Sequence, residues 1–274
     1  MFSQAFEVRA LVAGSAIAVA AGLVGYFLVL RNQVFTGDAL SHVAFTGALA
    51  ALAAGVDLRI GLFVGCVTFA VAMAALGRDG RADDVVIGNV FAWVLGLGVF
   101  FLTLYTTGAG GGDGTAGVNV LFGSIYGLSA AQTGVAVAVA AGVALIVVAG
   151  ARPLLFASVD PDVAQARGLP VGALGMAFLA LVGVTAGEAT QAVGALLILG
   201  LLATPAAAAS RLTPNPFRAL ALSATIALVA VWGGLIASYE ASSLPPSFAI
   251  LSITTGAYVL AAARSRRRPG ADAG

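Results

Sequence analysis

Nine apolar stretches run through the chain, and each is long enough to cross a lipid bilayer as a helix. The hydrocarbon layer is about 30 Å thick and needs roughly 20 apolar residues at 1.5 Å per residue. Because a helix satisfies its backbone hydrogen bonds within one segment, this pattern predicts an all-α, polytopic membrane protein. The pattern is compatible with eight to ten spans, and the nine expected ones are residues 8–30, 34–55, 58–77, 85–106, 130–151, 171–188, 191–209, 217–239 and 244–263.

Composition excludes several other classes of protein. Only 9% of the residues are charged and 60% are hydrophobic, whereas soluble domains carry about 25% charged residues. Cys66 is the single cysteine, which excludes an intramolecular disulfide and a cysteine-cluster metal site. The chain has no Gly-x-x-x-x-Gly-Lys-Ser/Thr loop, so we do not expect it to hydrolyse nucleotide or to be an enzyme.

The arginines are sorted by side of the membrane. With nine spans and the C-terminal end in the cytoplasm, eleven arginines fall on the cytoplasmic side and two outside, Arg9 and Arg59. This asymmetry predicts an external N-terminus and a cytoplasmic C-terminus. We expect one transmembrane domain over residues 1–263 and a disordered, arginine-rich cytoplasmic tail over 264–274.

The second stretch holds the only histidine, His42, four residues after Asp38. On a helix this spacing puts both side chains on one face, one turn apart. Carboxylate oxygen and imidazole nitrogen both bind divalent cations, and an ionisable pair at membrane depth is costly. Ser41 adds a polar group, and Gly37 and Gly47 allow close helix approach or local unwinding. The pair predicts metal or proton handling, with a buried pair satisfied by neighbouring helices as the alternative.

Two segments before the fifth stretch are too short to span. Residues 107–117 are rich in glycine, and without a lysine or Walker pattern they predict a flexible external linker rather than a phosphate cradle. Residues 118–128 are too apolar for a loop, so we expect a re-entrant or interfacial helix there.

A cytoplasmic stretch over residues 152–170 carries the signals of a short helix. Ser158 or Asp160 can cap its N-terminus, Pro161 suits its first turn, and Gly168 suits its end. The helix expected near 158–169 is either a simple connector or a docking element for a cytoplasmic partner.

Polar residues also interrupt the apolar run between 171 and 209. Glu188, Thr190 and Gln191 either lie along a permeation path or form an external turn between two spans, and the pattern favours the turn. Pro205 should kink the helix that contains it, because the proline ring removes one helical hydrogen bond.

Four blocks of sequence, in order along nearly the whole chain, resemble one family. They resemble the permease subunits of the zinc, manganese and iron group of metal-importing ATP-binding-cassette transporters. The blocks are residues 28–31 (Leu-Val-Leu-Arg) with 37–42 (Gly-Asp-Ala-Leu-Ser-His), 121–125 (Leu-Phe-Gly-Ser-Ile), 160–164 with 166–170 (Asp-Pro-Asp-Val-Ala and Ala-Arg-Gly-Leu-Pro), and 191–197 with 205–208.

The resemblance implies functions for particular residues. Asp38 and His42 would line the metal pathway, with Ser41 beside them. The block with Asp160, Ala164 and Gly168 resembles the helix that docks on the ATPase.

The resemblance also implies partners and a location. The permease would form a homodimer or a pseudo-dimer in a bacterial cytoplasmic membrane, with a cytoplasmic ATPase that binds ATP and an extracytoplasmic metal-binding protein. This chain would need no cofactor of its own and no nucleic acid, and its cargo would be a divalent zinc, manganese or iron ion. The alternatives are a permease of the same fold for a metal chelate or other small cargo, and a proton-coupled secondary transporter.

Overall fold

The computed structural model describes residues 4–107, 123–195, 198–241 and 243–266, and this part of the chain is helical. The described elements, in chain order, are α1 (Ala5–Leu30), α2 (Val34–Ala53), α3 (Leu58–Leu76), α4 (Asp84–Thr107), the 3₁₀ turn η1 (Ile125–Gly127), α6 (Ala130–Ala149), α7 (Ala151–Val159), α8 (Pro161–Ala166), α9 (Val171–Val193), α10 (Ile198–Leu212), α11 (Pro216–Glu240) and α12 (Pro246–Arg266).

The predicted spans correspond to nine of these helices. Seven described helices are long and apolar enough to cross a membrane by length and composition. The two outside that set are α2, which carries Asp38 and His42, and α10, which has only 15 residues. The prediction of a polytopic helical membrane protein is confirmed, and the number of spans stays a prediction.

The boundary between α9 and α10 differs from the expected one. Helix α9 continues through Val193, so Glu188, Thr190 and Gln191 lie inside a helix and the favoured prediction of an external turn is wrong. The Thr190 hydroxyl donates to the Ala186 carbonyl of the same helix at 2.7 Å, which lets a polar side chain sit within the bundle. A polar side chain that forms its hydrogen bond within its own helix gives the same sequence pattern as a residue in an external turn.

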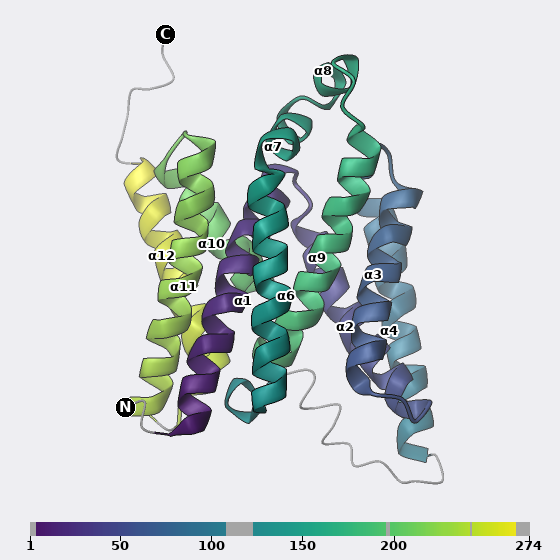
Figure 1. Cartoon of the computed structure of the whole chain (residues 1–274), viewed down its shortest axis with the longest axis vertical. Helices are drawn as coiled ribbons and strands as arrows, with labels where there is room; N and C mark the ends of the chain where they lie inside the picture. The colour runs from purple at the N-terminus through teal and green to yellow at the C-terminus, as the bar shows by residue number, and fades with distance from the viewer. Residues whose placement is uncertain (1–3, 108–122, 196–197, 242, 267–274) are drawn as a thin grey trace.

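Helix α1 is the most buried of the long helices and packs against α6, α9, α10 and α11. Helix α2 packs mainly against α3, α4 and α9, on the other side of the molecule (Figure 1). The backbone of α2 stays helical through Gly37 and Gly47, and the backbone at Gly47 meets that of Gly61 in α3. Gly47 therefore serves close helix approach rather than unwinding.

The two ends of the bundle differ in what they carry. Helices α7 and α8 and the end of α12 lie at one end, and the starts of α1 and α6 lie at the other (Figure 1). Helix α12 continues through Arg266, and residues 267–274 of the expected tail lie outside the described residues.

The re-entrant prediction falls partly on described residues. Residues 108–122, which include most of the glycine-rich segment and the start of the expected re-entrant helix, are outside them. Residues 123–128 hold the single turn η1, where Ile125 is buried and the Ser124 amide donates to the Gln191 carbonyl at 3.2 Å.

Candidate functional site

Asp38 and His42 lie one turn apart on the partly open face of α2, which is turned toward α4. Both side chains are half-buried. The His42 ring packs edge-on against Phe91 of α4, with ring centroids 5.0 Å apart and planes at 79°. The predicted shared face is therefore present, and it borders the seam between two helices.

A cavity of about 370 Å³ opens along this seam. From α2 it is lined by Phe35, Asp38 and Ala39, and α4 contributes another carboxylate, Asp84, together with Ile87, Gly88 and Phe91. At 1.5 Å per residue, Asp38 lies about 6 Å and His42 about 12 Å from the start of α2. The pair therefore lies in the half of the bundle that also holds α7 and α8 (Figure 1).

Ser41 has a different setting from its two neighbours. Its side chain is completely buried, and its hydroxyl donates to the Asp38 carbonyl of the same helix at 2.7 Å. The cavity is not lined by Ser41. A role for Ser41 in lining the pathway thus stays a prediction, and the open face of α2 carries Asp38 and His42.

The ligand set of one chain is incomplete for a divalent ion. Asp38 supplies oxygen and His42 supplies nitrogen, a combination that suits manganese, iron and zinc. Within the residues that the structure describes, no three His, Cys, Asp or Glu side chains come together as a metal-binding group. Further ligands would come from water, from another chain, or from another helix such as α4, whose Asp84 lines the same cavity.

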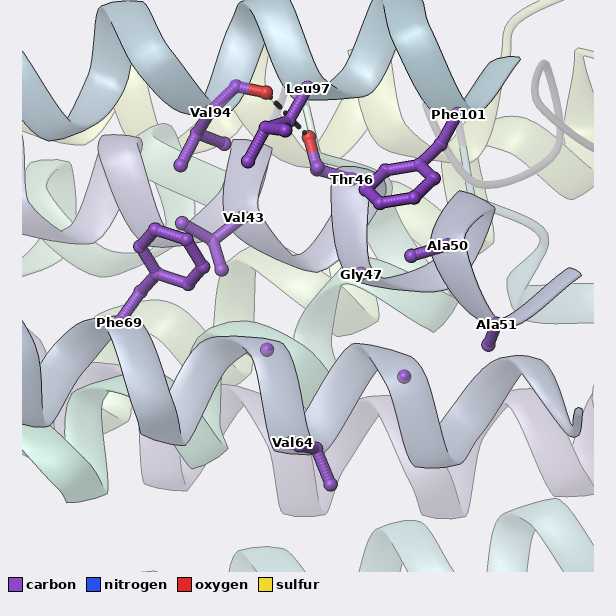
Figure 2. Close-up of a pocket in the computed structure, with 12 residues that line it drawn as sticks. Val43, Thr46, Gly47, Ala50, Ala51, Val64, Phe69, Val94, Leu97 and Phe101 are labelled. Carbon is purple, nitrogen blue, oxygen red and sulfur yellow. Dashed lines mark hydrogen bonds between the residues drawn. The ribbon is translucent and has the colours of Figure 1, made fainter. Parts of the chain in front are cut away.

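A second cavity, of about 240 Å³, lies between α2, α3 and α4 and has a different chemistry (Figure 2). Val43, Val64, Phe69 and Phe101 are among the apolar residues that line it. Thr46 has the one polar side chain in the described lining, and its hydroxyl already donates to the Val94 carbonyl at 3.0 Å. This cavity offers no ligand set for a metal ion.

Glu188 is a buried acid that the sequence interpretation placed in an external turn. Its side chain is 4% exposed, and its Oε2 atom has no hydrogen-bond partner. Arg59, at the start of α3, is close enough to act on it electrostatically, and the Arg59 Nη2 atom also lacks a hydrogen-bond partner. The only signal in the sequence was a charge within an apolar run, and the burial could not be foreseen from it.

Arg31 is a buried cation at the opposite end, in the short connection between α1 and α2. Its guanidinium lies 5.0 Å from the ring centre of Phe178 in α9. Burial and, to a smaller extent, the nearby charge of Arg81 together lower the pKa of Arg31 to about 10. Arg31 therefore stays protonated at neutral pH. In the sequence, Arg31 indicates only the cytoplasmic side of the membrane.

The predicted short helix near 158–169 is present as α8, which follows α7 at a sharp elbow. Asp160 caps it, because its Oδ1 atom accepts from the Val163 amide at 3.0 Å. Gly168 follows the helix with φ of +83°, a conformation that favours glycine. Ala164 is fully buried against Ala157 and Val171. These three residues build the elbow, and the exposed residues of α8 are Asp162, Val163, Gln165 and Ala166.

Long apolar helices around a half-buried Asp–His pair define a class of protein: a polytopic membrane protein of the transport type. The chain belongs to the ABC 3 transport family, whose profile matches residues 3–265. The family consists of membrane permeases of ABC transporters, so the chain is a transport component rather than an enzyme, and a multi-pass protein of the cytoplasmic membrane.

Characterised proteins resemble the chain over most of its length. The "Manganese transport system membrane protein MntC" of Halalkalibacterium halodurans is 29% identical over 246 residues, which cover 89% of this chain and 82% of that protein. The "Chelated iron transport system membrane protein YfeD" of Yersinia pestis is 28% identical, over 91% of this chain and 83% of its own. The solved structure of PsaBC from Streptococcus pneumoniae in complex with Fab has a TM-score of 0.81 and 26% identity, covering 94% of this chain and 91% of that one.

Proposed function

We propose that this chain is the membrane subunit of an importer for a bare divalent metal ion, with manganese, zinc and iron as the candidate cargoes. The observation that carries the proposal is the placement of Asp38 and His42 on one face of α2, beside a cavity that Asp38 and Asp84 line. Oxygen and nitrogen ligands of this kind suit these ions. The relatives named for manganese and iron transport support the same cargo class.

The partners follow from what one chain lacks. Two ligands do not complete a divalent site, so a second copy of this chain would complete the pathway. A cytoplasmic ATPase that binds ATP would supply energy through α8, and an external metal-binding protein would deliver the ion. Helices α7 and α8 would face the cytoplasm together with the C-terminus, and the N-terminus would lie outside, as the arginine distribution predicts.

A metal chelate is the second candidate cargo, because YfeD is named for chelated iron transport. A small site with one carboxylate and one imidazole fits a bare ion better than a bulky chelate. Competition of a chelating agent with metal uptake separates the two cargoes, because it blocks uptake of a bare ion and supports uptake of a chelate.

Metal binding by the purified complex tests the proposal. The wild-type complex is dialysed against manganese, zinc or ferrous iron and its metal content is compared with that of Asp38→Ala and His42→Ala. We expect each substitution to lower affinity at least about tenfold and to abolish uptake in vesicles, because ligand losses of this kind are large.

Glu240→Ala is the matched control, since it removes an exposed carboxylate at the far end of α11. Its metal content should equal that of the wild type. Equal metal content and uptake in all variants, with the protein folded and inserted, would contradict the assignment of the Asp38–His42 site.

A further inference from the structure

The connection between α3 and α4, residues 77–83, is tied to the elbow of α7 and α8. The Arg81 guanidinium donates through Nη2 to the Ala157 carbonyl at 2.7 Å and to the Ser158 carbonyl at 3.1 Å. Both carbonyls belong to the last turn of α7, where helix carbonyls lack helical partners and a cation is favoured. One arginine therefore closes the end of a helix from a different part of the chain.

The backbone of the same connection is wedged against the start of α9. Gly80 has φ of +68°, and a Cβ there would lie 2.8 Å from the Met176 nitrogen and 2.9 Å from the Gly175 Cα atom. From the other side, a Cβ on Gly175 would lie 2.6 Å from the Gly80 oxygen and 2.7 Å from the Asp79 oxygen. Contact between two backbones leaves no flexible side chain to absorb a displacement.

The connection also reaches the two helices that form the metal site. Gln33, the residue before α2, donates from Nε2 to the Ala82 carbonyl at 3.4 Å. Asp83 caps the start of α4, because its Oδ1 atom accepts from the Val86 amide at 2.8 Å. Two turns further on, Phe91 of α4 packs on His42. Residues 77–83 thus contact the α7–α8 elbow, α9, and the beginnings of both α2 and α4.

We propose that Arg81 is a positioning residue that passes the movement of the α7–α8 elbow to α4, and so opens and closes the cavity beside Asp38 and His42. The inference rests on the proposed function only in that an ATPase moves the elbow. An arginine suits this role because its planar guanidinium donates to two carbonyls at once, which a lysine ammonium does with less geometric definition. Residues 77–83 then connect the α7–α8 elbow, on which the ATPase would act, directly to the metal site.

Distances between α2 and α4 test the proposal independently of the cargo. Spin labels at Phe35→Cys, at the edge of the cavity lining on α2, and at Asn89→Cys, beside the lining on α4, occupy exposed positions, while Cys66 is completely buried. The full complex with its ATPase is measured with and without ATP and vanadate. We expect a nucleotide-dependent change of distance in the otherwise wild-type complex and its loss in Arg81→Ala, with the ATPase still bound.

Metal transported per ATP hydrolysed in liposomes is the second measurement. We expect this ratio to fall about fivefold or more in Arg81→Ala, the range of typical coupling between sites, and to recover in part in Arg81→Lys. Arg78→Ala is the matched control, because Arg78 lies in the same connection with the same charge but is exposed. It should behave as the wild type in both measurements.

Each outcome bears on the proposal. An unchanged distance response and transport ratio in Arg81→Ala would overturn it, as would an equal loss in Arg78→Ala. If Arg81→Ala does not fold, Arg81→Met decides in its place, because it keeps the length of the side chain but removes its donors, and a wild-type response in that variant overturns the proposal. A nucleotide-dependent distance change that depends on Arg81, without any metal transport by the wild type, would refute the proposed cargo and support the mechanical role.

Discussion

Gly22 of α1 lies directly against the backbone of α11, and its substitution tests how the bundle is held together. A Cβ at this position would lie 2.6 Å from the Ala224 Cα atom and 2.9 Å from both the Ala224 nitrogen and the Ser223 oxygen. Carbon atoms pack at about 3.5–4.0 Å, so Gly22→Ala has to separate the two helices by about 1 Å. All three obstructing atoms belong to the backbone, and no side chain can turn away to make room.

The substitution Gly22→Ala changes the free energy of unfolding through contributions of opposite sign. Alanine gains up to about 1 kcal/mol over glycine in a helix interior. Overpacking costs about 1–3 kcal/mol. Separation also strains the 2.7 Å hydrogen bond that the Ser223 hydroxyl donates to the Gly22 carbonyl, and such bonds between membrane helices average about 0.6 kcal/mol. The net loss is about 1–2 kcal/mol, which corresponds to a Tm lower by about 2–6 °C.

Thermal unfolding of the detergent-solubilised protein, followed by size-exclusion chromatography, measures the effect. Gly142→Ala in α6 is the matched control, because a Cβ there meets nothing within 4 Å. Its Tm should be equal to or above that of the wild type. A Gly22→Ala protein that melts at or above the temperature of the Gly142→Ala protein would refute the argument that backbone contact holds α1 to α11.

Two further predictions concern α8 and α9. Val163→Glu, at a side chain that is 43% exposed, should reduce ATPase pull-down without changing Tm. Ala164→Arg, at a fully buried site, should lower both the pull-down and the Tm. Full pull-down of the ATPase by both variants would argue against docking on α8. Glu188→Gln should raise the free energy of unfolding by about 1 kcal/mol, because it removes a buried charge with an unpartnered oxygen. A lower Tm for Glu188→Gln would show that the charge is stabilised by its surroundings.

The spans could be predicted from the sequence because the bilayer fixes both length and composition. Seven of the nine predicted stretches both start and finish within three residues of the corresponding helix ends, and the two exceptions meet where α9 gives way to α10. Local chemistry also identified α8, since Asp160 and Pro161 are start signals that need no tertiary partner. Features that depend on the residues of a single segment could therefore be predicted from the sequence.

Features that depend on the packing of one segment against another could not be predicted from the sequence. Glu188 looked like a turn residue because a buried charge and a solvated one lower the hydropathy of a sequence equally, and only the packing of α9 distinguishes them. The spacing of Asp38 and His42 correctly placed them on one face. Ser41 adjoins His42 in sequence, but neighbouring residues of a helix project about 100° apart, which turns the Ser41 hydroxyl into the bundle.

The faces along which the helices pack were also hidden, for a physical reason. Helix α1 is apolar on all sides, so no amphipathic pattern points to its neighbours. Lipid is as apolar as the side chains, and association depends on close contact at small residues and a few hydrogen bonds. Gly22 against Ala224 and Gly80 against Gly175 are contacts of this kind, and neither is distinguishable in sequence from the glycines that face open space.

The distribution of charge along the bundle connects these contacts to function. Arg31, Arg81, Asp38 and Asp84 all lie in the half that holds α7 and α8, and the cavity beside His42 opens between the beginnings of α2 and α4. A site in the middle of the bundle would require movement to pass through several apolar helix contacts. At this end one connection of seven residues, 77–83, contacts the elbow, α9, and the beginnings of α2 and α4. A small displacement of the elbow can therefore change the distance between the two helices that border Asp38, without rearrangement of the α1–α11 contact.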